Sequence, residues 1–382
     1  MQFLRVRSKV ARPSLAYALG SDKIFLCWLP ITIAILRRPY LACSAFQLGR
    51  EERGNYFGEF TLMATAFQIP GFEQIESAHP VVAKFGHRTP AITCESLNEI
   101  SRLKLFFKCE NFQKTGAFKF RGAINAVSQL TDAQKANGVV THSSGNHAAA
   151  LTKAASLFDI PAYIVMPSNS SKFKMSAVES YGGQITVCEP NDESRRSTAD
   201  AIAQNTGATL IPPFDHTHII AGQGTCAKEL LEDVPDLDVI ITPIGGGGLM
   251  SGTCIAARTM KPDIKIIGGE PEGADDAYRS LKSGERKANE TVNTIADGLR
   301  TSLGELTWPV VRDYVNEIVT VTDDEIRALM KEFFERTKLL IEPSCTVAVA
   351  PALYRKSDLL TDGMRVGVII TGGNVDLLDM PI

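Results

Sequence analysis

The 382-residue sequence lacks the patterns that mark several classes of protein. It has no Cys-x-x-Cys pair and no His-Glu-x-x-His run, so its eight cysteines and six histidines predict neither a disulfide framework nor a zinc site. Scattered thiols are typical of a reducing compartment, and we therefore expect a cytoplasmic protein. The net charge of −3, without an acidic or basic tail, gives no reason to expect nucleic acid as a partner.

Long apolar runs are also missing. Residues 24–36 form a run of 13, fewer than the roughly 18–20 that cross a bilayer, so no membrane partner is expected. Residues 1–50 carry eight Lys or Arg and one acid, a composition compatible with a mitochondrial transit peptide. The simpler interpretation is an extension outside the fold, because Met63 begins a run typical of a cytosolic N-terminus. In both cases we expect residues 1–62 to take no part in the fold.

From about residue 100, short apolar strands alternate with helices. Strands are expected at residues 105–108, 139–141, 162–165, 185–187, 209–211, 239–244, 265–267 and 366–370, and helices at 118–130 and 148–157. Continuous apolar strands separated by helices predict an α/β fold with parallel sheets covered on both faces. Ligands of such folds bind at the carboxyl ends of the strands.

Four consecutive glycines, at residues 245–248, follow the apolar strand that ends near Ile244 and precede a helix. Glycines allow successive backbone N–H groups to turn inward, and such a loop at a helix N-terminus binds phosphate. The run has neither the P-loop form nor the Gly-x-Gly-x-x-Gly spacing of a dinucleotide site. A small monophosphate fits best, and the alternative is a close-packed turn.

Lys119 lies between two phenylalanines in the segment 114–122. Desolvation there would lower its pKa and free the amine as a nucleophile, although a lysine beside aromatics is more often a surface residue.

A third motif, at residues 142–147, reads His-Ser-Ser-Gly-Asn-His and lies where a strand enters a helix. Its N–H groups and hydroxyls are suited to hold a carboxylate, and a plain helix N-cap is the alternative interpretation.

A reactive amine, a carboxylate cradle and a phosphate cradle together suit pyridoxal phosphate (PLP), which requires a lysine. With these motifs in place, residues 63–378 resemble the fold-type II PLP enzymes, and most closely the serine racemase and serine/threonine dehydratase family. The segments that carry the resemblance, in family order and spacing, are 107–116, 118–122, 143–147, 221–225, 245–248 and 371–374.

The resemblance implies a tryptophan synthase β-like fold of two domains, each with a mainly parallel sheet flanked by helices. Residues 63–137 and 216–382 would form a large PLP-binding domain, and residues 138–215 a small inserted domain. It also implies a homodimer that acts on a small amino-acid substrate.

The resemblance assigns roles residue by residue. Lys119 matches the Schiff-base lysine, Asn146 the side chain that hydrogen-bonds the PLP phenolic oxygen, and Thr371 the hydroxyl that faces the pyridine nitrogen. The phosphate loop is matched by Gly245, Gly246, Gly247 and Gly248. The substrate pocket is matched by Ser143, Ser144, Gly145, His147 and Asp297, and more loosely by Gly298, Thr301 and Arg195.

Ser144 bears on the choice between two activities. Racemisation needs an acid or base on each face of the substrate's planar carbanion, and Lys119 serves one face. Dehydratases of the family often carry Ala where this chain has Ser144, so the sequence favours a serine racemase that also eliminates water from serine. A serine or threonine dehydratase, or a racemase acting on aspartate, remains the alternative.

A second site is implied at residues 269–276, which include acidic residues and two glycines near one turn. Hard divalent cations prefer several oxygens from one tight loop. Racemase-like members of the family bind Mg²⁺ or Ca²⁺ with residues that match Glu270, the Ala274 carbonyl and Asp276.

Two departures from the animal racemases matter. Ala148-Ala149 stands where those enzymes have Gly-Gln, which argues against ATP as an effector, and Phe214 replaces an Asn, as in threonine dehydratases. A PLP-free regulatory protein is the non-enzymatic alternative, and the retention of Lys119 with the glycine loop argues against it.

Overall fold

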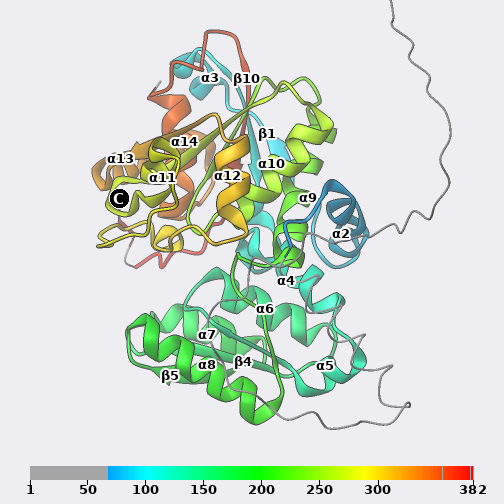
Figure 1. Ribbon diagram of the computed structural model, residues 1–382. Coiled ribbons are helices and arrows are strands. Elements are labelled where there is room, and N and C mark those ends of the chain that lie inside the picture. The colour runs from blue at the N-terminus through cyan, green and yellow to red at the C-terminus, as the bar shows by residue number, and fades with distance from the viewer. Residues whose placement is uncertain (1–67, 355, 379, 382) are drawn as a thin grey trace, which may run out of the picture. The chain divides into compact units, whose positions relative to one another are not determined.

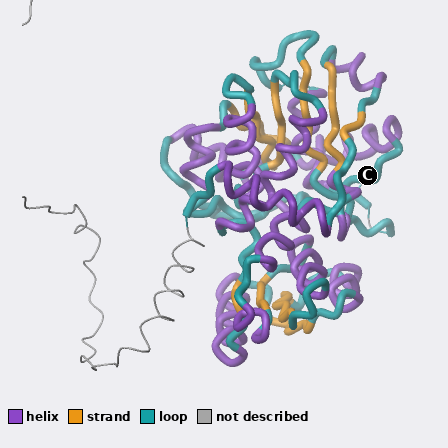
Figure 2. Tube along the Cα trace, turned by 90° about the vertical axis from the view of Figure 1, so that its right-hand side faces the viewer, coloured by secondary structure: helices purple, strands orange, loops and turns teal. Residues whose placement is uncertain are grey.

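The computed structural model describes residues 68–354, 356–378 and 380–381, so the prediction for residues 1–62 lies outside the described part. Its strands fall into two separate sheets (Figures 1 and 2). The strands are β1 (Ala91–Ile92), β2 (Lys104–Cys109), β3 (Val139–His142), β4 (Ala162–Pro167), β5 (Gln184–Cys188), β6 (Thr209–Leu210), β7 (Val239–Pro243), β8 (Lys265–Pro271), β9 (Glu317–Val321) and β10 (Arg365–Ile370).

Helices lie between most of these strands. They are α2 (Phe72–Phe85), α3 (Glu95–Ser101), α4 (Lys119–Ser128), α5 (Asp132–Asn137), α6 (Asn146–Ser156), α7 (Lys172–Ser180), α8 (Asp192–Thr206), α9 (Thr217–Asp233), α10 (Gly248–Met260), α11 (Asp276–Ser283), α12 (Thr307–Tyr314), α13 (Asp323–Thr337) and α14 (Pro343–Leu353). None of the helices in this described part combines the length and apolar character needed to cross a bilayer.

The six-stranded sheet has the order β1-β2-β10-β7-β8-β9. All neighbours are parallel except β1 and β2. Because β2, β10 and β7 are adjacent and parallel, the segments that follow Cys109, Ile370 and Pro243 meet at one edge of the sheet. These segments lead to the predicted Lys119, Thr371 and glycine loop.

The four-stranded sheet has the order β5-β4-β3-β6 and is parallel throughout. Its strands all come from residues 139–210, in the middle of the chain. The loop at residues 143–145 leaves the carboxyl end of β3 and leads directly into α6. The prediction of an α/β fold with two mainly parallel sheets is confirmed, whereas the exact domain boundaries at 138 and 215 stay a prediction.

The large sheet is buried on both faces. In β7, Val239 and Ile241 belong to one apolar cluster and Ile240 to the cluster on the other side. All three side chains are fully buried. Such a strand shows a continuous apolar run rather than an alternating one, which is why the sequence pattern identified it.

The glycines of residues 221–225 serve close helix packing. A Cβ atom at Gly222 would lie 2.5 Å from the Arg121 carbonyl oxygen on α4. A Cβ at Gly252 of α10 would lie 2.5 Å from the backbone nitrogen of Gly224. Helix α9 therefore approaches both α4 and α10 with its backbone, and any larger residue would push the helices apart.

Two strands were not expected from the sequence, β1 and β9, and both lie at the edges of the six-stranded sheet. Strand β9 begins with Glu317 and is only partly buried, and β1 has two residues. Edge strands need less apolar surface than central ones, so their sequence signal is weak.

Candidate active site

Lys119 is the first residue of α4 and lies half-buried at the carboxyl end of the six-stranded sheet. Its Nζ donates a hydrogen bond of 2.8 Å to the Pro213 carbonyl oxygen and lies 5.2 Å from the centre of the Phe118 ring. Burial lowers the pKa of Lys119 to about 8, against an opposing effect of the nearby Glu342 carboxylate. More of this amine is therefore neutral and nucleophilic near physiological pH than in an ordinary lysine, although the protonated form still predominates.

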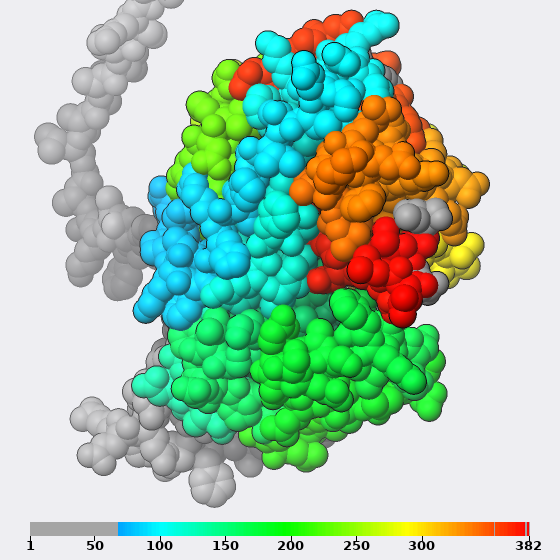
Figure 3. All heavy atoms as spheres, turned by 180° about the vertical axis from the view of Figure 1, so that it is seen from behind, coloured from blue at the N-terminus to red at the C-terminus, as the bar shows by residue number. Residues whose placement is uncertain are grey.

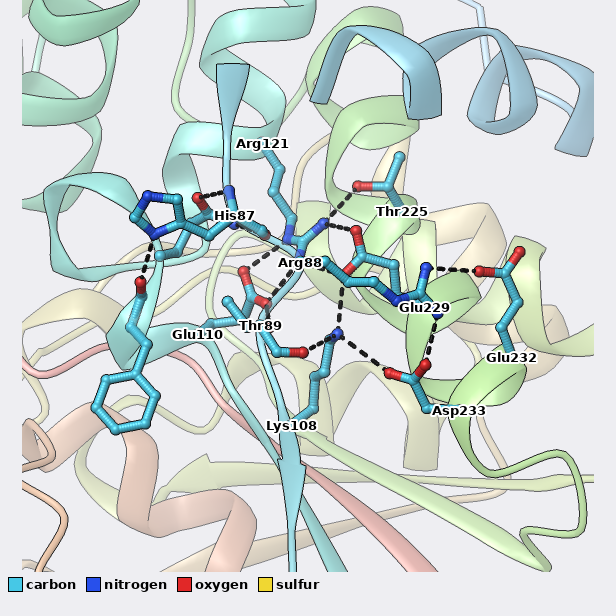
Figure 4. Close-up of polar contacts among 12 residues, drawn as sticks. His87, Arg88, Thr89, Lys108, Glu110, Arg121, Thr225, Glu229, Glu232 and Asp233 are labelled. Carbon is cyan, nitrogen blue, oxygen red and sulfur yellow. Dashed lines mark hydrogen bonds and ion pairs between the residues drawn. The ribbon is translucent and has the colours of Figure 1, made fainter. Parts of the chain in front are cut away.

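The helix that carries Lys119 is anchored by buried charges (Figure 4). Arg121, two residues further on, donates to both oxygens of Glu110 at 2.6 and 2.8 Å and to both oxygens of Glu229 at 2.8 and 2.7 Å. Lys108 donates to Glu229 at 2.8 Å. All four side chains are buried, and two positive charges compensate two negative ones. Sequence patterns did not reveal this network, because Glu229 lies 121 and 108 residues from its partners Lys108 and Arg121.

The glycine loop fits a phosphate group. Gly245, Gly246, Gly247 and Gly248 are all buried, and none of their backbone N–H groups donates a hydrogen bond to another residue in the described ranges. Gly247 has a φ of +85°, which favours glycine. Four buried donors without partners at the N-terminus of α10 are suited to bind an anion, and their role as the phosphate loop stays a prediction.

The segment after β6 joins the lysine to this loop. Pro213 accepts the Lys119 hydrogen bond, and the next residue, Phe214, packs so closely on the loop that a Cβ at Gly246 would lie 2.4 Å from its ring. Asp215 accepts hydrogen bonds from the backbone of residues 305–307 just before and at the start of α12. The reactive amine and the phosphate cradle therefore belong to one site.

The predicted carboxylate loop precedes α6. Ser143, Ser144 and Gly145 are half-buried, and the Gly145 N–H lies 3.4 Å from the Ser143 hydroxyl. His147 is buried, and its Nε2 bonds the Ile211 carbonyl oxygen at 3.0 Å. Burial, with a further contribution from the Lys119 charge, lowers the pKa of His147 to about 3. A neutral His147 with Nε2–H as donor therefore holds the start of α6 against the segment that carries Pro213.

Thr371 follows β10 and is buried, and its role facing the pyridine nitrogen of PLP stays a prediction. Its Oγ1 lies 3.1 Å from the Cys345 sulfur, which also bonds the Gly372 carbonyl oxygen at 2.9 Å. Burial, with the Glu342 charge, raises the pKa of Cys345 to about 12, so this thiol stays protonated.

Glu342 is a site residue that the sequence patterns did not identify. It precedes α14, it is 4% exposed, and both of its oxygens accept from the Asn146 amide, at 2.8 and 3.0 Å. Burial, with a further effect of Asp297, raises the pKa of Glu342 to about 7. The only sequence signal was an acid followed by a proline at the start of an apolar helix.

Asp297 lies at the surface and pairs with Lys174 of α7. Asp297 lies between two strands of the six-stranded sheet, β8 and β9, whereas α7 lies between two strands of the four-stranded sheet, β4 and β5. The ion pair therefore links the two parts of the chain that form the two sheets. In Figure 3 the C-terminal residues in red also lie against this green part of the surface, and Asn374 donates to the Asn146 side chain at 2.9 Å.

The predicted cation site contains two buried acids. Glu270 accepts from the backbone of Ala277 and Tyr278, and Asp276 from Asn289 and the backbone of Leu303. Neither acid forms an ion pair with any described residue, and the described residues contain no cluster of three or more His, Cys, Asp or Glu side chains that suits a metal.

Burial, with the charge of the neighbouring acid, raises the pKa of Glu270 well above its ordinary value, and burial raises the pKa of Asp276 to about 6. Together with the buried Ala274, the two carboxylates are compatible with a hard cation that also takes a carbonyl and water.

Comparison with known proteins shows the family to which the chain belongs. The family model described as pyridoxal-phosphate dependent enzyme matches residues 82–372. A beta-hydroxyaspartate dehydratase from Paracoccus denitrificans is 49% identical over 313 residues, which are 82% of this chain and 99% of that protein. A serine racemase from Arabidopsis thaliana is 50% identical over 306 residues, 79% of this chain and 92% of that protein.

A solved structure of maize serine racemase superposes with a TM-score of 0.80 at 46% identity, covering 81% of this chain and 95% of that one. The matched family model spans the segments around the lysine and the glycine loop. The chain therefore belongs to the pyridoxal-phosphate-dependent enzymes of fold type II, among their racemases and dehydratases.

Proposed function

We propose that this enzyme is a serine racemase that interconverts L- and D-serine and also eliminates water from serine. The observation that carries the proposal is the Lys119 amine, poised at a pKa of about 8 and joined to the glycine loop through Pro213 and Phe214. Lys119 would hold PLP covalently, residues 245–248 its phosphate, Asn146 its phenolic oxygen and Thr371 its ring nitrogen.

In this proposal, Lys119 and Ser144 transfer protons on opposite faces of the substrate. Bound PLP supplies an electron sink that acidifies the α-hydrogen of the amino acid. The freed Lys119 amine removes that hydrogen, and the loop of Ser143, Gly145 and His147 holds the substrate carboxylate. Ser144, in the same loop, returns a proton on the opposite face, which produces the other enantiomer.

Dehydration is the second candidate activity, and the 49% identity to a beta-hydroxyaspartate dehydratase favours it. It begins with the same removal of the α-hydrogen by Lys119, followed by loss of the β-hydroxyl. From serine, the products after hydrolysis are pyruvate and ammonia. Serine and threonine are the substrates to compare for dehydration, whereas aspartate, which has no β-hydroxyl to lose, is to be compared for racemisation only.

A chiral amino-acid screen with parallel keto-acid detection tests the proposal. Ser144→Ala should lower racemisation by about 10²- to 10⁴-fold, because one of the two proton carriers is lost, while elimination from one enantiomer persists. Ser156→Ala, an exposed serine on α6, is the matched control and should change neither rate. An equal loss of both reactions in Ser144→Ala, with PLP still bound, would contradict the role of Ser144.

The proposal also includes a cation site, a homodimer and a cytoplasmic location. Glu270, Asp276 and the Ala274 carbonyl would hold Mg²⁺ or Ca²⁺ in a structural or activating site, since they supply no reacting group. A homodimer is proposed from the family resemblance. The described cysteines are free thiols, which supports a reducing compartment and hence the cytoplasm.

A further inference from the structure

Glu342 is a buried carboxylate that lacks a cationic partner of its own among the described residues. It precedes α14, yet its side chain does not cap that helix. Its side chain instead accepts from neutral donors, the amide of Asn146 and the backbone of Asn374. The charged groups that influence it are Asp297, Lys174 and Lys119, each from a different element. A carboxylate placed in this way needs a role other than ion pairing, because burial without a counter-charge is costly.

The hydrogen bonds around Asn146 fix which way its amide points. Asn374 donates from its Nδ2 to the Asn146 Oδ1 at 2.9 Å, and the Asn146 Nδ2 faces the Glu342 carboxylate. Rotating the Asn146 amide by half a turn would place its oxygen against the carboxylate and its nitrogen against another N–H donor. Only one orientation therefore satisfies both neighbours.

The same geometry leaves one donor of Asn146 free. The two contacts of 2.8 and 3.0 Å run to the two oxygens of one carboxylate, which lie too close together to take one N–H each. A single N–H thus points between them. The second N–H, directed away from Glu342, has no partner among the described residues and is the donor available to a ligand.

We propose that Glu342 is a positioning residue that locks the Asn146 amide with its free N–H directed at the phenolic oxygen of PLP. The proposal rests on the cofactor contact of Asn146 in the proposed function and adds the residue that enforces it. Glu342 lies on the six-stranded sheet's part of the chain and Asn146 at the start of α6, so this hydrogen bond also fixes the cofactor contact across the two parts.

A double-mutant cycle tests whether Glu342 acts through Asn146. PLP dissociation constants and the visible absorption maximum are measured on the full chain for Asn146→Ala, Glu342→Met and the double variant. Each single variant should weaken PLP binding about tenfold, the size of one hydrogen bond to a charged group. The double variant should stay within about twofold of Asn146→Ala. A loss of about a hundredfold, the additive result, would overturn the proposal.

The conservative variant Glu342→Gln keeps an acceptor for the Asn146 N–H and the volume of the side chain. It should restore PLP binding to within about threefold of the wild type and return the absorption maximum towards the wild-type position. If Glu342→Met does not fold, Glu342→Ala with and without Asn146→Ala completes the cycle, and an equal loss of PLP affinity in both backgrounds contradicts the proposal. Glu332→Gln, at the surface of α13, is the control.

These measurements separate this proposal from the proposed function. None of them depends on whether the enzyme racemises or dehydrates. Borohydride reduction of each variant, followed by peptide mapping, shows whether PLP is attached to Lys119. An adduct elsewhere contradicts the proposed site, whereas additive losses with the adduct on Lys119 overturn only the role of Glu342.

Discussion

Two sets of buried charges, the network around Arg121 and the carboxylate of Glu342, differ in whether each charge has a partner of opposite sign. Around Arg121, two cations and two carboxylates pair completely, and the hydrogen bonds and charge of Arg121 outweigh burial, so the pKa of Glu229 falls to about 2. Around Glu342, the carboxylate meets a neutral amide and burial raises its pKa to about 7. A carboxylate that is paired with cations has a low pKa and stays ionised at neutral pH. A buried carboxyl group without such a partner has a pKa near 7, so it can gain or lose a proton at neutral pH.

Both sets of buried charges act on Lys119. Arg121 lies in the first turn of α4, the turn that begins with Lys119, so the compensated network holds the backbone of the reactive residue. Glu342 acts on the same amine, because its charge raises the pKa of Lys119 against the effect of burial. The paired network of Arg121 thus holds the backbone at Lys119, and the unpaired Glu342 changes the pKa of its amine.

Breaking the paired network should have the largest effect on stability. Arg121→Met leaves the buried Glu110 and Glu229 without their shared partner, and we expect a loss of about 3–5 kcal/mol in the free energy of unfolding. Urea denaturation of the purified variant measures it. Arg312→Met, which removes an exposed pair with Asp313, should leave the free energy of unfolding nearly unchanged, because solvent screens the two charges. Similar small losses in both variants would show that the network does not anchor α4.

The acids Glu270 and Asp276 resemble Glu342 in being buried without an ion-pair partner among the described residues, but they lie outside the site around Lys119. If they hold a divalent cation, saturation with Mg²⁺ or Ca²⁺ at about a hundred times its dissociation constant should stabilise the fold by about 2.7 kcal/mol over the chelated protein. Thermal melts with and without chelator measure this difference.

Asp276→Asn should abolish the response to the cation, whereas Asp263→Asn, an exposed aspartate, should retain it. A full response in Asp276→Asn would place the cation elsewhere.

Acid should weaken the paired network gradually. A carboxyl with a lowered folded-state pKa contributes stability that is present above its unfolded pKa, near 4.5 for Glu229, and is lost as the pH falls toward about 2. The stability gap between the wild type and Glu229→Gln should therefore narrow by about 1.4 kcal/mol between about pH 6 and about pH 3.5. Urea midpoints at both pH values check this, and a constant gap would mean that Glu229 is not held ionised by Arg121.

The sequence predicted the parts of this molecule that depend on local pattern. The central strands appear as continuous apolar runs, and the glycines at 245–248 and the lysine at 119 stand at the strand ends where ligands of parallel sheets bind. Family resemblance added the cofactor, and the matches to serine racemases and PLP enzymes confirm that assignment. The individual site roles and the domain limits stay predictions.

The features that the sequence did not show are long-range ones. Glu342 and Asn146 are 196 residues apart, and Arg121 and Glu229 are 108 apart, so no spacing rule connects them. A buried charge differs from a surface charge only in the residues that fold over it. In the sequence, Lys108 within the apolar strand β2 and Glu110 just after it look like ordinary polar residues. The edge strand β9 was missed for the related reason that partial burial requires little apolar sequence.

In the proposed function, the amine at position 119 holds the cofactor. Borohydride reduction of the purified enzyme, followed by proteolysis and peptide mass mapping, shows which residue carries PLP. We predict one pyridoxyl adduct, on the peptide that contains Lys119, and no adduct in Lys119→Ala. An adduct on any other lysine, or no adduct in a protein that still binds PLP and turns over serine, would contradict it.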